Sequence, residues 1–103
     1  MFKIKANPTF PATVKIRAPG GDVQELPVVF RHKRKDEVKT FFEEASAKDK
    51  SDVDCILELV ESWKADAELS ADSVAELLQN YPASAHAIFN CYMSELIDAR
   101  LGN

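Results

Sequence analysis

The first third of the chain alternates apolar and polar residues with the two-residue period of a β-strand. Val14 and Ile16 lie on one side of residues 12–18, and polar or charged residues occupy the positions between them. The stretch 19–22, Pro-Gly-Gly-Asp, is typical of a tight turn, because proline presets one backbone dihedral and glycine permits positive φ. The alternation resumes in residues 23–32. The pattern therefore predicts a β-hairpin with one buried face.

Two further features bear on the sheet. Phe2 and Ile4 alternate with lysines, so residues 2–5 are a candidate third short strand. Pro27 has no N–H group to donate to a strand ladder, and we therefore expect the free side of its strand to be a sheet edge.

After residue 34 the apolar period becomes that of amphipathic helices. Four helical patterns follow one another: one centred on Val38 to Ala45, one from Ser51 to Trp63, one from Ser70 to Tyr81 and one from Pro82 to Leu101. The second is apolar over much of its circumference and is the best candidate for the centre of the core.

The predicted helix ends rest on local chemistry. Ser51 and Ser70 are expected N-caps, because a serine hydroxyl can satisfy a free amide of the first turn. Pro82 suits the first turn of the last helix, and Gly102 suits its end. In that helix the predicted buried side carries Ala85, Phe89, Tyr92 and Leu96, with Ile88 and Ile97 beside it.

Strands first and helices after predict an α+β fold. We expect an N-terminal β-hairpin packed on a bundle of about four α-helices. Residues 2–5 are the candidate for a third short strand beside the hairpin. A length of 103 residues suits a single domain, with residues 1–33 as a hairpin cap and residues 34–103 as the helical part.

The net charge of −4 conceals a split between the two halves of the chain. Residues 1–50 carry 11 Lys and Arg against 7 Asp and Glu, whereas residues 51–103 carry 2 against 10. The acidic half would repel phosphate, which argues against broad nucleic-acid binding. The basic half could meet an acidic surface on a partner or on another copy of the chain.

No catalytic or metal-binding constellation is predicted. His32, His86, Cys55 and Cys91 lack the close ligand spacing of zinc sites, and each cysteine is expected to be a small buried apolar residue. Glu58 and Glu61 share a face and are expected to be solvated. We therefore expect no enzyme, no cofactor and no metal. No segment resembles a signal peptide or a membrane span, so the expected location is a reduced cytosol with no membrane partner.

The run 31–35, Arg-His-Lys-Arg-Lys, is the strongest nucleic-acid candidate, yet aromatic residues are not interleaved with it and the whole chain is acidic. Phe41 and Phe42 are adjacent on one helix and so point about 100° apart. Both can be buried only where two surfaces meet, and a second helix or a partner would supply one of them.

The chain resembles the tail assembly chaperones of long-tailed bacteriophages and prophages over nearly its whole length. The resemblance rests on the opening MFKIKANPTF, the Pro-Gly-Gly turn at 19–21 and the segment FRHKRKDE at 30–37. Its strongest parts are LLQNYPASAHAIFNCY at 77–92, Glu95-Leu96 and the closing ARLGN. These motifs indicate kinship without displaying a mechanism.

The resemblance implies a non-enzymatic protein that acts in the cytoplasm of the bacterial host and is absent from the mature virion. Its implied partners are the tape measure protein, which it would keep soluble, and the major tail tube protein, which it would help to recruit. Self-association is a further expectation, and no nucleic-acid partner is expected. A structural tail or neck component and a small DNA-binding regulator remain alternatives. The expected partner-binding residues are Phe41, Phe42, Tyr81, Tyr92, Arg31, Lys33, Arg34 and Lys35.

Overall fold

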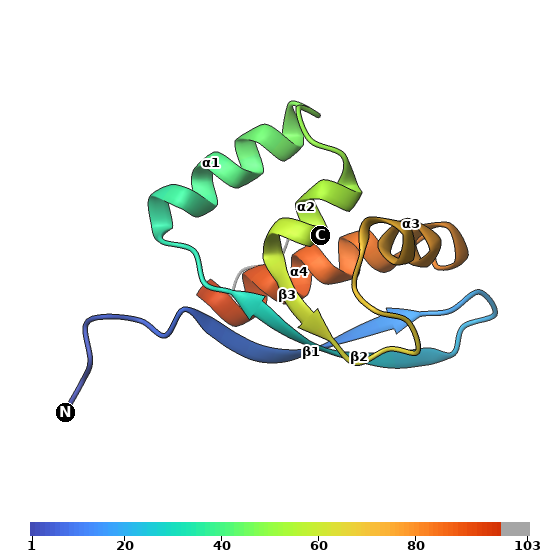
Figure 1. The fold of residues 1–103 in the computed structure, drawn as a ribbon, viewed down its shortest axis with the longest axis horizontal. Helices are drawn as coiled ribbons and strands as arrows, with labels where there is room; N and C mark the ends of the chain where they lie inside the picture. The colour runs from blue at the N-terminus through green and yellow to red at the C-terminus, as the bar shows by residue number, and fades with distance from the viewer. Residues whose placement is uncertain (98–103) are drawn as a thin grey trace.

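The computed structural model describes residues 1–97, which form a three-stranded antiparallel sheet and four helices. The elements are β1 (Thr9–Arg17), β2 (Val23–Arg31), α1 (Lys35–Ser46), α2 (Asp52–Leu59), β3 (Val60–Trp63), α3 (Ala71–Asn80) and α4 (Ser84–Ile97). All four helices lie on one side of the sheet (Figure 1). The α+β prediction is confirmed. The expected stop at Gly102 lies outside the described residues.

The hairpin forms as predicted, although β1 begins at Thr9 rather than near residue 12. Ala18 N–H donates to Asp22 O at 2.7 Å across the turn, where Gly20 and Gly21 both have positive φ near 100°. At the other end, His32 N–H donates to Pro8 O at 2.9 Å. Even-numbered residues of β1 therefore carry the ladder, and the ring nitrogen of Pro11 faces the open edge. That placement explains how a proline fits inside β1.

The third strand is not residues 2–5 but β3, so that prediction is wrong. β3 pairs with β2 through Val28↔Trp63, Val29↔Ser62 and Phe30↔Val60, which leaves Glu61 as an extra, bulged residue. The helix expected to run to Trp63 ends at Leu59 instead. Pairing with the second edge of β2 outweighs the helical periodicity here, because β-branched Val60 and aromatic Trp63 suit a strand.

β2 is the central strand of the sheet, so the expectation of a free edge at Pro27 is wrong. The carbonyl of Pro27 accepts a hydrogen bond from Lys64 N–H at 2.9 Å. Pairing with β3 ends at this point, and the missing N–H of Pro27 therefore interrupts no continuous ladder.

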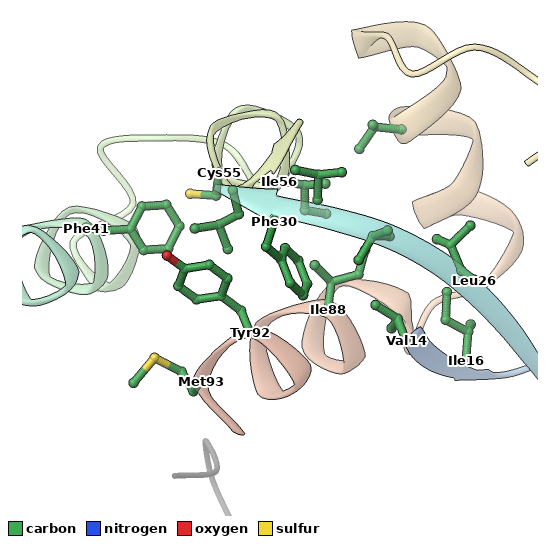
Figure 2. Close-up of a cluster of buried hydrophobic side chains, with 14 of the residues drawn as sticks. Val14, Ile16, Leu26, Phe30, Phe41, Cys55, Ile56, Ile88, Tyr92 and Met93 are labelled. Carbon is green, nitrogen blue, oxygen red and sulfur yellow. The ribbon is translucent and has the colours of Figure 1, made fainter. Parts of the chain in front are cut away.

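The core lies between the inner face of the sheet, α2 and α4. Val14, Leu26, Val28 and Phe30 supply the sheet side, and Ile56, Leu59, Ile88 and Tyr92 supply much of the helical side. Figure 2 shows Phe30 lying between the side chains of α4 and those of α2. The prediction that α2 is central is confirmed, since its Cys55, Ile56 and Leu59 are buried.

Two predicted N-caps are confirmed. Ser51 Oγ accepts from Asp54 N–H at 3.1 Å, and Ser70 Oγ accepts from Ser73 N–H at 3.1 Å. α4 begins at Ser84 rather than at Pro82, because residues 82–83 form a turn closed by Ser84 N–H and Tyr81 O.

The buried residues of α4 differ in part from the predicted set. Ser84, Ile88, Tyr92 and Met93 are buried, whereas Ala85, Phe89 and Leu96 are only half-buried. Ile97, expected beside the buried side, is exposed. Compared with the prediction, the buried side of the helix is therefore centred nearer to Ile88, which faces the sheet and α2.

Candidate functional site

Six of the eight predicted partner-binding residues gather where β2 leads into α1. We call this region the α1 junction and define it as residues 31–35 together with Phe41, Phe42 and Phe89. Its basic run lies between Arg31, the last residue of the central strand, and Lys35, the first residue of α1. The junction is thus anchored on one side and open to solvent on the other.

Arg31 anchors the junction to α2. Its Nη1 donates to the backbone carbonyls of Leu57, Glu58 and Val60 at 2.8, 3.3 and 3.1 Å. The last carbonyls of a helix have no partner within the helix and carry partial negative charge, so a guanidinium group satisfies both needs. Arg31 therefore closes α2 where the chain changes from helix to strand.

Lys33 and Lys50 hold Glu58 between them. Lys33 Nζ lies 2.6 Å from Glu58 Oε2, and Lys50 Nζ contacts Glu58 Oε1. Burial by itself would raise the pKa of Glu58, but the hydrogen bonds and charges of the two lysines outweigh it and lower the pKa. The expectation that Glu58 is solvated is wrong, because only 27% of its side chain is exposed. No local sequence pattern predicts this cluster, because its members lie on three separate segments.

The aromatic part of the junction joins α1 to α4. The Phe41 and Phe42 rings are 4.9 Å apart in an edge-to-face arrangement, and each lies 6.4 Å from the Phe89 ring. Phe41 is 1% exposed, while Phe42 remains half-buried. The adjacent phenylalanines thus meet two environments, the core and a partly open surface over α4. Lys33 Nζ also lies 5.5 Å from the centre of the Phe41 ring.

Two cations of the basic run remain directed to solvent. Arg34 and Lys35 are exposed, and the contact of Arg34 Nε with Asp36 Oδ1 is long at 3.9 Å. Arg34 N–H donates to Glu37 Oε1 at 2.7 Å and begins α1. Because Arg31 and Lys33 are engaged within the fold, fewer charges remain for phosphate contacts than the sequence suggested.

Tyr81 and Tyr92 do not share a groove. Tyr92 is fully buried against Phe10 and Phe30, and its hydroxyl donates to Arg31 O at 2.8 Å. Tyr81 is half-buried and lines a separate hollow of about 340 Å³ at the other end of the hairpin, near Ile16. Phe10 and Ile16 are six residues apart on β1, which corresponds to about 20 Å. Phe41 and Tyr92 thus support the surface from within and do not form it in this conformation.

In residues 1–97, no three His, Cys, Asp or Glu side chains gather in a way that could hold a metal ion. Burial raises the pKa of the Cys55 and Cys91 thiols, which disfavours the reactive thiolate. Within the same range, no helix is long and apolar enough to cross a membrane.

A family model described as phage tail assembly chaperone matches residues 1–103. No curated protein and no solved structure matches the chain.

Proposed function

Because the chain belongs to the phage tail assembly chaperone family, we propose that it binds and solubilises the tape measure protein. We further propose that it helps to recruit tail tube subunits, and that it works without enzymatic activity in the host cytoplasm. The observation that carries the proposal is the family match over residues 1–103.

The α1 junction supports a helical partner. Phe42 is half-buried beside Phe89, so its ring offers apolar surface that a further helix could cover. Exposed Arg34 and Lys35 flank this surface with positive charge. An amphipathic helix that docks in an apolar groove is held by anchors at i, i+3 and i+4, and the charges would fix its orientation.

The hollow at Tyr81 is a second candidate contact. It is lined by Leu26, Leu77 and Tyr81 and also by Gln24, Glu25, Lys64 and Asp66, so it combines apolar walls with polar and charged groups. It lies away from the α1 junction, and one copy could therefore touch a long partner at two places. Weak contacts repeated along one rod-like partner add up through avidity.

Co-expression with the tape measure protein of the same phage genome tests the proposal. We expect the tape measure protein to stay soluble and to co-purify with many copies of this chain. An insoluble tape measure protein, with this chain alone in the supernatant, would contradict the chaperone role. Mass spectrometry of purified virions and a DNA-binding assay over a salt series would then test the two alternatives.

Paired alanine variants locate the surface. Phe42→Ala removes a half-buried ring from the α1 junction, and we expect about three- to tenfold less soluble tape measure protein. Val23→Ala is the control, since Val23 is 60% exposed at the turn end of β2, opposite the end that leads into α1. Circular dichroism confirms that both variants fold. If both changes lower the amount of soluble tape measure protein equally, Phe42 is not part of the partner surface.

A further inference from the structure

Residues 1–8 form a segment whose apolar side chains have no cover. Met1, Phe2 and Ile4 are 119%, 85% and 91% exposed. Lys3 and Lys5 alternate with Phe2 and Ile4 as in a strand, yet the segment is not part of the sheet. Figure 1 shows it running away from the body of the molecule. Exposed rings and branched chains in this pattern favour burial against another surface.

An acidic, partly apolar hollow lies along the free edge of the sheet at β3. It measures about 390 Å³, and Trp63 and Leu69 provide its half-buried apolar lining. Glu61, Asp66 and Glu68 are exposed around it. β3 is an edge strand without proline. The Val60 carbonyl already accepts from Arg31 Nη1, so the outward N–H and C=O groups of residues 61–63 are the ones that can pair with another strand.

We propose that residues 1–8 of one copy add as a strand to the β3 edge of a second copy. Phe2 and Ile4 would cover the lining at Trp63 and Leu69, and Lys3 and Lys5 would meet the acidic residues around it. Main-chain hydrogen bonds supply affinity in such strand addition, and alternate side chains supply specificity. The proposal does not depend on tape measure binding.

The other sheet edge is the poorer acceptor. The ring nitrogen of Pro11 faces that edge and cannot donate a hydrogen bond. Lys15 and Arg17 on β1 are exposed and would repel a lysine-bearing segment. Because donor and acceptor surfaces are different parts of one chain, the contact is head-to-tail and yields rings or open filaments.

Charge reversal in two separate variants tests the proposal. One variant carries Lys3→Glu and Lys5→Glu, and the other carries Glu61→Lys, Asp66→Lys and Glu68→Lys. Sedimentation velocity over a concentration series should show self-association of the original chain, weakened about tenfold or more in each variant alone. An equimolar mixture of the two variants should regain association, because each segment then meets a hollow of opposite charge.

Trp63 is the only tryptophan and reports on the acceptor hollow itself. We expect its fluorescence emission to shift to the blue as the original chain associates and when the variants are mixed. Charge reversal of Lys39 and Lys48, which are exposed on or just after α1 and lie on neither sheet edge, is the control and should leave association unchanged. A chain that stays monomeric at every concentration would overturn the proposal, as would variants that associate like the original or a mixture that fails to recover.

Discussion

The hydroxyl group of Tyr92 donates a hydrogen bond to the backbone carbonyl of Arg31 across 2.8 Å. This bond ties the last helix to the end of the central strand. The side chain of the same Arg31 binds the final carbonyls of α2. Arg31, the first residue of the α1 junction, therefore connects three elements that lie far apart in the sequence.

Tyr92→Phe should lower the free energy of unfolding by about 1 kcal/mol at neutral pH. The ring packing on Phe10 and Phe30 is kept, and the loss comes from the part-buried Arg31 carbonyl, which no longer has this donor. Urea unfolding followed by circular dichroism measures the difference. An unchanged midpoint would show that the hydroxyl contributes nothing to stability.

The original chain and the Tyr92→Phe variant should respond differently to alkali. Burial raises the pKa of Tyr92 to about 12 in the folded chain, whereas an unfolded tyrosine has a pKa of about 10. The folded state thus holds the proton more tightly, and the stability this provides is complete below pH 10 and lost as pH rises through 12. At pH 11 the original chain should have lost about 1 kcal/mol more than the Phe variant, relative to pH 8. If the difference in unfolding free energy between the two proteins is the same at pH 8 and pH 11, the pKa of Tyr92 is not raised in the folded chain.

Arg31→Lys keeps the charge at the end of α2 but shortens the side chain by one bond. We expect a loss of about 1–2 kcal/mol, because the lysine nitrogen cannot take the position of Nη1, which donates to all three carbonyls. Arg17→Lys makes the same chemical change at an exposed position and should alter stability by less than about 0.5 kcal/mol. Chemical denaturation of both variants compares them. Equal losses would mean that the carbonyl contacts of Arg31 are unimportant.

Glu58→Gln should destabilise the chain by about 1–2 kcal/mol at pH 7, because Lys33 and Lys50 lose their shared carboxylate. The folded pKa of Glu58 is lowered, so its contribution is present above the unfolded value of about 4.3 and is lost as pH falls further. The variant should therefore show a flatter stability profile below pH 5. Glu76→Gln on the exposed face of α3 is the control and should leave both stability and profile unchanged.

Ser84→Ala should be neutral or stabilising by about 0.5–1 kcal/mol. Ser84 is fully buried, and among the described residues its hydroxyl has no hydrogen-bond partner. Ser73→Ala makes the same chemical change but should destabilise the chain. Ser73 Oγ accepts from Ser70 N–H at 2.9 Å and donates to Glu68 O at 2.6 Å, and the variant loses both hydrogen bonds. Thermal unfolding of the two variants distinguishes these outcomes, and a clear loss in Ser84→Ala would point to a partner for its hydroxyl.

Local chemistry alone determined the hairpin with its Gly20-Gly21 turn, the N-caps at Ser51 and Ser70, and the apolar character of α2. Each depends on residues a few positions apart, which fix backbone dihedrals and the first hydrogen bonds of a helix. The family resemblance could likewise be read from the sequence, and the match over residues 1–103 confirms it.

Only the tertiary structure decided which edge of β2 gained a strand and which charges were free. The apolar period of α2 continues through Val60 to Trp63, yet pairing with Val28 to Phe30, some thirty residues away, makes that stretch β3. The same long-range packing engaged Lys33 with Glu58 and separated Tyr81 from Tyr92. Sequence spacing describes neighbours along one element, whereas these contacts depend on how separate elements meet in space.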